Sequence, residues 1–358
     1  MENKATPRLG LHAGEWVQVR TKEEILETLD GKGRLDELPF MPEMLQYCGK
    51  KMQVGKRAHK TCDPALGCVG RKMTSAVHLE NVRCDGSAHD GCDAGCLIFW
   101  KEAWLKRPDD RPDEQGVVLS GKGENSQRPK CTEETLRSTI KSSAGGGEDD
   151  AIYVCQNTQV KFATQPLEFY DVRQYVEDYA SGNVSISQFA SGFLYFVWKT
   201  VAEARIGIGT PMRWIYDQFQ RARGGTPYPL RPFGVPKGTS TPKALLDLQP
   251  GERVRVKPFQ DILNTLDSRY RNRGLYFDQE YVPFTEKEFV VSRRVKQIID
   301  ERTSKMVRFK TDAIVLDNVV CEARYAECRR FCPRAIIPFW REIWLERVSK
   351  SPQDQNRT

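Results

Sequence analysis

The sequence has no apolar run near the roughly 20 residues that a membrane-spanning helix needs. Its first residues, 1–8, are mostly polar or charged and lack the apolar core of a secretory signal. We therefore expect a cytoplasmic protein without a transmembrane segment. Only four histidines occur, the last of them at position 89, so histidine cannot act as a ligand or base from any later position.

The sequence also lacks the common catalytic motifs. It has no phosphate-binding loop, no Gly-x-Ser-x-Gly and no His-Glu-x-x-His, so the catalytic residues are unknown and enzyme activity stays open. The net charge is +7, but basic and acidic side chains alternate without a long run of one sign. A mildly basic solvated surface explains this balance, so nucleic-acid binding is possible but less favoured than a small-molecule or protein partner.

The chain contains two copies of one module, at residues 14–107 and 251–348. Nine of the seventeen residues from Gly14 to Asp30 recur at a constant shift of 237 positions. Both copies end in a Phe-Trp-x-Glu-x-Trp-Leu tail, whose tryptophans we expect to cap the core of each module. A duplication of this kind fixes the architecture better than it fixes the activity.

Each copy opens with Gly-Glu-x-Val-x-Val and continues into about five short β-rich segments. This pattern resembles a small β-barrel of the Src-homology-three type. The paired copies also resemble a bacterial family whose repeats end in a cysteine loop and a Phe-Trp-Arg-Glu-Ile-Trp-Leu-like tail; the resemblance implies a bacterial origin and supplies no activity. The expected fold class is α+β, with two homologous small β-barrel modules and a helical insert between them.

The composition divides the chain into six segments. We expect an N-terminal tail (1–13), the first barrel repeat with a cysteine site (14–107), a flexible linker (108–150), a helical insert with a Pro/Gly-rich connection (151–250), the second barrel repeat with a cysteine site (251–348) and a C-terminal tail (349–358). Apolar positions in 184–204 favour a packed helix. A helix in peripheral contact with a membrane or partner is the alternative.

Eleven cysteines in a reducing compartment indicate metal binding or reactive thiols rather than disulfides. In the first repeat, Cys84, Cys92 and Cys96 form a Cys-x7-Cys-x3-Cys run. Three thiolates plus Cys62 or His59 would complete a four-donor site for zinc or an iron–sulfur cluster. The spacing matches neither a zinc ribbon nor a standard ferredoxin, so the metal stays open.

The second repeat has a similar run at Cys321, Cys328 and Cys332, but Lys296 and Ile299 stand where His59 and Cys62 would be. Three donors leave an open coordination position, unless Cys155 or Cys131 completes the site. Four arginines lie near this run and would lower thiol pKa values and attract an anionic cofactor or ligand. They are Arg324, Arg329, Arg330 and Arg334.

The sequence therefore predicts a cytosolic protein that holds zinc or an iron–sulfur cluster in its cysteine triplets and acts in a redox or biosynthetic pathway. The first site is expected to be mainly structural, and the second functional. One alternative is a non-catalytic tandem-barrel scaffold with structural zinc for protein or nucleic-acid partners. Another is a membrane-associated assembly factor.

Overall fold

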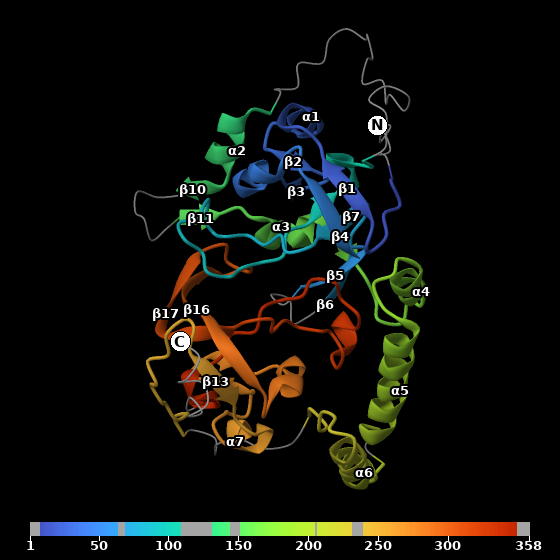
Figure 1. Ribbon diagram of the computed structural model, residues 1–358, viewed down its shortest axis with the longest axis vertical. Coiled ribbons are helices and arrows are strands. Elements are labelled where there is room, and N and C mark those ends of the chain that lie inside the picture. Colours follow the sequence, from blue (N-terminus) through green and yellow to red (C-terminus); the bar gives the residue numbers. More distant parts are fainter. Residues whose placement is uncertain are drawn as a thin grey trace, which may run out of the picture. The chain divides into compact units, whose positions relative to one another are not determined.

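The fold is taken from a computed structural model, which describes residues 8–63, 69–108, 131–143, 151–204, 206–230 and 239–348 (Figure 1). Most of the predicted linker and the whole C-terminal tail, 349–358, lie outside the described residues, as do residues 1–7 of the N-terminal tail. The described chain mixes helices and sheets, so the predicted α+β class is confirmed.

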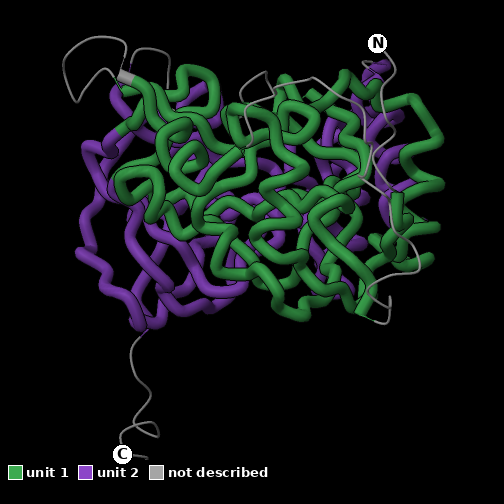
Figure 2. Tube along the Cα trace, turned by 90° about the horizontal axis from the view of Figure 1, so that it is seen from above, with its two compact units in different colours: residues 1–189, 297–307, 331–334 green, residues 190–296, 308–330, 335–358 purple. Residues whose placement is uncertain are grey.

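The chain divides into two compact units (Figure 2). Unit 1 comprises residues 1–189, 297–307 and 331–334; unit 2 comprises residues 190–296, 308–330 and 335–358. Unit 1 thus contains the first repeat together with two short pieces of the second. The domain boundaries expected from the sequence follow the repeats, whereas these units follow the contacts, so the boundaries stay a prediction.

A five-stranded antiparallel sheet forms the centre of unit 1, in the order β8-β7-β4-β1-β9. In β1, Val17 and Val19 are buried while Trp16, its first residue, is exposed, because alternate residues of a strand point to opposite faces. The strands are β1 (Trp16–Val19), β4 (Lys51–Arg57), β7 (Ala76–Leu79), β8 (Trp100–Lys101) and β9 (Leu105–Lys106).

Helices and short strands surround this sheet. Helix α1 starts where Thr21 and Glu24 form a capping box, which satisfies two backbone N–H groups at its first turn. The remaining elements of unit 1 are α1 (Lys22–Thr28), β2 (Arg34–Leu35), β3 (Leu38–Pro39), η1 (Pro42–Tyr47), β5 (Lys60–Asp63), β6 (Val69–Lys72), η3 (Glu102–Trp104), α2 (Glu133–Thr139), β10 (Lys141–Ser143), β11 (Ala151–Tyr153), α3 (Gln156–Ala163), β12 (Gln165–Pro166) and α4 (Arg173–Ala180).

Unit 2 is built on a four-stranded sheet in the order β17-β16-β13-β18. Three elements have residues in both units: α5 (Ile186–Ala202), β16 (Glu288–Ile299) and β17 (Met306–Leu316). The others are α6 (Gly209–Ala222), β13 (Arg253–Val256), α7 (Phe259–Leu263), β14 (Arg271–Asn272), β15 (Leu275–Tyr276), η5 (Gln279–Phe284), η6 (Glu327–Arg329), η7 (Glu342–Trp344) and β18 (Leu345–Arg347).

Both sheets are open. Within the described residues, β8 does not pair with β9, and β17 does not pair with β18. The structure therefore gives a partly curled sheet for each repeat. The closed small barrel stays a prediction.

The tail tryptophans lie in the hydrophobic cores and make the same contacts in both repeats. Trp104 donates its indole N–H to Oγ1 of Thr28 at 3.1 Å, and Trp344 donates to Oγ1 of Thr265 at 2.9 Å. Each indole also meets the edge of a phenylalanine ring at 5.2 Å between centroids, from Phe40 and Phe277 respectively. The indole N–H groups of Trp104 and Trp344 are thus satisfied, whereas those of Trp100 and Trp340 are buried without a hydrogen-bond partner.

The glutamates of the tails bind the segments that precede each repeat. The Glu102 carboxylate accepts the backbone N–H groups of residues 9–11, at 2.7 to 3.3 Å. Glu342 accepts those of residues 246–248, at 2.7 to 3.3 Å. The repeated structure thus starts before positions 14 and 251. Residues 9–11, assigned to the tail by sequence, are part of the folded module.

Among the described residues, no helix is both long and apolar enough to cross a membrane. Helix α5 nevertheless exposes part of its apolar surface. Phe193 and Leu194 are 57% and 68% exposed, whereas Tyr195 is buried.

Candidate metal centre

Four cysteines of unit 1 line one small cavity. Cys84 follows β7, Cys92 and Cys96 lie in the loop after it, and Cys155 occupies the N-cap of α3. The cavity has a volume of about 30 Å³, enough for an ion or a water molecule. Glu43 and His89 line it as well, and Met41, Leu97, Ile98 and Ile299 provide apolar walls.

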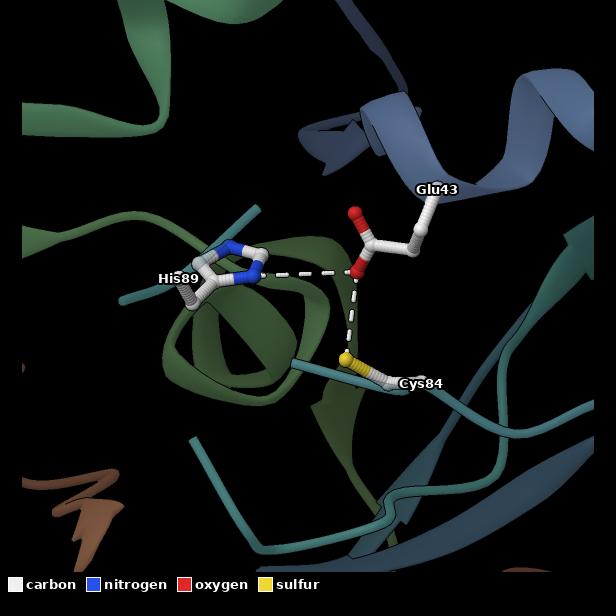
Figure 3. Close-up of side chains that lie close together, drawn as sticks. All are labelled: Glu43, Cys84 and His89. Carbon is white, nitrogen blue, oxygen red and sulfur yellow. Dashed lines mark hydrogen bonds and ion pairs between the residues drawn. The ribbon is translucent and has the colours of Figure 1, made fainter. Parts of the chain in front are cut away.

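Three different donor types lie close together among the residues that line this cavity (Figure 3). One ligand atom each from Glu43, Cys84 and His89 lie within 4.8 Å of one another. Cys84 donates its S–H to Oε1 of Glu43 at 3.1 Å, and Nδ1 of His89 lies 3.7 Å from the same oxygen. The Glu43 and His89 side chains are almost fully buried, at 2% and 1% exposure. The group therefore combines oxygen, sulfur and nitrogen donors away from bulk water.

The orientation of His89 leaves a lone pair inside the cavity. Its Nε2 lies 3.2 Å from the carbonyl oxygen of Val154. Because a carbonyl only accepts, we assign the ring proton of neutral His89 to Nε2, and Nδ1 then carries a lone pair. This lone pair faces Glu43 Oε1, an acceptor. Nδ1 of His89 and Oε2 of Glu43 are buried without a hydrogen-bond partner.

Backbone N–H groups point toward the sulfur atoms of Cys92 and Cys155. Cys92 Sγ accepts the N–H of Ile299 at 3.4 Å. Cys155 lies at the start of α3. Burial raises the pKa of its thiol to about 11, and the backbone N–H groups of Thr158 and Asn157 oppose this rise. N–H groups directed at sulfur favour the thiolate and are typical of metal-bound cysteine.

The other two thiols have higher pKa values. Burial, followed by the Glu43 carboxylate, raises the pKa of Cys84. Burial, followed by Glu301, raises the pKa of Cys96. These cysteines are protonated at neutral pH when no cation is bound, so a metal that binds them must displace their protons.

The grouping of donors differs from the sequence-based one. Cys155, expected as a donor for the second triplet, lies with the first. His59 lies away from it: its Nε2 is 3.1 Å from Oδ1 of Asp178 in α4, and the His59 and Asp178 side chains are both buried. Lys60 joins this ion pair at 2.5 Å from the other carboxylate oxygen. His59 thus has Asp178 as a buried partner, and its role as a metal ligand stays a prediction.

Cys62 contacts Cys332 instead of the first triplet. The two thiols are hydrogen-bonded, and this contact together with burial raises the pKa of Cys332. Arg334 donates from Nη1 to the carbonyl oxygen of Cys62 and from Nη2 to Glu301, both at 2.6 Å. A member of the second triplet thus lies beside a cysteine of the first repeat, within unit 1. Cys321 and Cys328 belong to unit 2, so the predicted second metal site stays a prediction.

The four arginines expected to bind an anionic cofactor have partners within the protein. Three guanidinium groups form ion pairs with carboxylates, and the fourth stacks on an aromatic ring at 4.3 Å. This reduces the positive charge that they offer to a ligand, and their role in cofactor binding stays a prediction. The partners of Arg324, Arg329, Arg330 and Arg334 are Glu322, Asp278, Phe196 and Glu301, in that order.

Glu43 is the donor that the sequence did not single out. Its counterpart in the second repeat is Glu280, whose buried carboxylate accepts the backbone N–H groups of residues 324–326 at 2.7 to 2.8 Å. The carboxylate of Glu43 receives a thiol proton and is directed toward an imidazole instead. The signal that could have found it is the recurrence of a glutamate at matching positions beside both cysteine loops.

The two remaining described cysteines pack in the hydrophobic core of unit 1. Cys131 is buried, and Cys48 is partly buried against the same core. Burial raises the pKa of both thiols. Cys131 does not line the cavity of the first triplet, and Cys68 lies outside the described residues.

No protein-family model matches the sequence, and a search of curated proteins finds no significant similarity to any of them.

Proposed function

We propose that this protein binds a metal in the cavity of unit 1, through Glu43, Cys84 and His89. The observation that supports this is the convergence of three buried ligand atoms: Nδ1 of His89 lies 3.7 Å from Oε1 of Glu43, and the thiol of Cys84 is directed at the same oxygen at 3.1 Å. A cation that replaced the thiol proton would attract all three atoms at once. The carbonyl of Val154 fixes the histidine ring, as second-shell partners of metal ligands do.

The donor set fits zinc. Carboxylate oxygen, thiolate sulfur and imidazole nitrogen are its three common protein ligands, and three of them leave one position for water or substrate. When bound, zinc would act as a Lewis acid and supply a positive charge that stabilises the Cys84 thiolate beside Glu43. The protein contributes a dry cavity and a histidine held in one tautomer.

An iron–sulfur cluster is the second candidate, and four thiols on one cavity wall favour it. A single zinc ion bound by four thiolates holds their sulfurs roughly 3.8 Å apart, from Zn–S bonds of about 2.3 Å in a tetrahedron. In the described residues, no three cysteine sulfurs lie within 4.8 Å of one another. A cluster of several irons holds its thiolates farther apart than one ion does.

Metal, iron and sulfide analysis of protein purified with and without oxygen tests both candidates. About one zinc per chain in colourless protein supports the first, and a brown protein with acid-labile sulfide supports the second. Cys84→Ser should lose the metal, whereas Cys48→Ser, outside the cavity, should keep it. Protein without bound metal under both conditions, even after addition of zinc or of iron and sulfide, contradicts the proposal.

The wider role follows the sequence-based hypothesis: a metal protein of a redox or biosynthetic pathway, with a scaffold held by structural zinc as the alternative. The two predict different consequences of metal removal. If the metal is only structural, chelation and Cys84→Ser unfold unit 1. If the metal works in a reaction, the apo-protein stays folded and exchanges its metal. We also propose that each open sheet belongs to a small barrel of the Src-homology-three type, which the pattern of short β-rich segments in each repeat resembles.

Peripheral membrane contact through α5 is a separate proposal. Phe193, Leu194 and Val197 expose large apolar side chains along one face of this helix. Flotation with anionic and neutral lipid vesicles tests it, with the Phe193→Ser/Leu194→Ser variant as comparison. Absence of the wild-type protein from the vesicle fraction contradicts the proposal.

A further inference from the structure

Unit 2 contains a basic cleft that is distinct from the cysteine loops. It has a volume of about 530 Å³. The β14–β15 hairpin, β17 and the Phe-Trp-x-Glu-x-Trp-Leu segment of the second repeat line it. Four cationic side chains line it, together with three hydroxyl side chains and one aromatic ring. They are Arg273, Arg308, Lys310, Arg341, Ser240, Thr241, Thr311 and Phe309.

Arg341 is the buried cation of this cleft, with 7% of its surface exposed. Its Nη1 donates to the carbonyl oxygen of Thr311 at 2.8 Å, and its Nη2 donates to the carbonyl oxygen of Arg273 at 3.1 Å. Its Nε is buried without a hydrogen-bond partner. Within the part of unit 2 that the structure describes, the four cations of the cleft form no ion pair with a carboxylate. A buried charge without a counterion is costly, so the site favours an added anion.

In the first repeat, a carboxylate neutralises the cation that corresponds to Arg341. Lys101 corresponds to Arg341, and its Nζ donates to the Asp36 carboxylate at 2.9 Å and to the carbonyl oxygen of Thr74 at 3.2 Å. Arg273 stands at the position of Asp36. The second repeat has therefore replaced the counterion by a second cation, while the carbonyl contact to the matching threonine is retained.

We propose that this cleft binds a phosphate-bearing small molecule of nucleotide size. Guanidinium groups donate paired hydrogen bonds to phosphate oxygens, and the hydroxyls of Ser240 and Thr241 add further donors. The volume lies in the range of roughly 300–1,000 Å³ that small-molecule sites have. The ring of Phe309 provides a wall against which a planar group can pack. This inference does not depend on the metal centre.

Isothermal titration with inorganic triphosphate, ATP and adenosine tests the proposal on the full chain. We expect ATP and triphosphate to bind and adenosine to bind at least tenfold more weakly. Arg273→Asp copies the counterion of the first repeat, so it should keep the fold and weaken ATP binding at least tenfold. Arg269→Ala, at an exposed arginine that does not line the cleft, should leave binding unchanged.

A second titration distinguishes a nucleic acid from a small molecule as the source of the phosphate groups. A single-stranded oligonucleotide offers the same groups along a polymer, and its binding depends steeply on salt. Binding of the oligonucleotide without ATP would overturn the assignment to a small molecule. Equal affinity of wild type and Arg273→Asp for ATP, with both melting alike, would overturn the site itself.

Discussion

Ile299 donates its backbone N–H to the sulfur of Cys92, 207 positions earlier in the chain, at 3.4 Å. The corresponding residue of the first repeat, Cys62, contacts Cys332 of the second. In both cases a strand of one repeat packs against the cysteine loop of the other, within unit 1. The environment of each of these sulfurs is therefore completed by the opposite repeat.

The first prediction concerns the metal ligands. Glu43→Gln removes the carboxylate charge but keeps the size of the side chain and one carbonyl oxygen. We expect zinc affinity to fall by more than about tenfold, the lower end of the range for changes around metal ligands. Competition with a chromogenic chelator measures it. The matched control is Glu27→Ala, an exposed glutamate of α1; equal affinities of Glu43→Gln and wild type would remove Glu43 from the site.

The second prediction concerns pH. Burial, with a contribution from Arg334, lowers the pKa of His78 to about 3, from an ordinary value of 6.5. Below pH 6.5 the unfolded chain takes up a proton that the folded chain does not, so the free energy of unfolding decreases as the pH is lowered. The loss amounts to about 2 kcal/mol between pH 7 and pH 5. Urea unfolding at both values measures it.

His78→Asn provides the control for that experiment. Nδ1 of His78 lies 2.8 Å from the carbonyl oxygen of Ile98, and an asparagine amide can donate to the same oxygen without titrating. The variant should lose about 2 kcal/mol less stability than the wild type on going from pH 7 to pH 5. An identical pH dependence would assign the acid sensitivity to other groups.

The third prediction concerns the segment before the first repeat. Glu102→Ala leaves the N–H groups of residues 9–11 without their charged acceptor. We expect a loss of about 3 kcal/mol in the free energy of unfolding, because hydrogen bonds to charged groups contribute more than neutral ones. Deletion of residues 1–11 should cost more, because it also removes the buried side chain of Leu11, but the combined loss with Glu102→Ala should be smaller than the sum of the two. Additive losses would contradict this coupling.

The fourth prediction concerns the Arg334–Glu301 ion pair, in which Arg334 is buried and Glu301 is partly exposed. Arg334→Met breaks the pair and should lower the free energy of unfolding by about 3 kcal/mol, at the low end for a buried pair because Glu301 retains some solvent. The double variant Arg334→Met/Glu301→Leu should recover part of the loss. Thermal melting of the three proteins measures it, and a double variant less stable than Arg334→Met would argue against the pair.

The sequence predicted the α+β class because the Val-x-Val strands and the helical turns have clear periods. It also singled out Cys84, Cys92 and Cys96, which the structure brings to one cavity. The fourth thiol, Cys155, was named as a donor but assigned to the second site, since the shift of 237 positions compares one repeat with the other and Cys155 lies outside both. Cys155 has no counterpart in that comparison, and Cys62 accepts a hydrogen bond from Arg334, 272 positions later. Such long-range pairings depend on packing rather than on local pattern.

The composition of unit 1 has a consequence for biosynthesis. Cys155 leaves the ribosome before Ile299 has been added. The interval between the synthesis of these two residues lasts on the order of ten seconds at ordinary elongation rates. During that time the four thiols of the cavity are already outside the ribosome, but the wall contributed by Ile299 is missing. The nascent chain thus exposes its cysteines to solvent and oxidants. We therefore expect the proposed metal to enter the cavity after synthesis, and the thiols to need reducing conditions until residues 331–334 have been added.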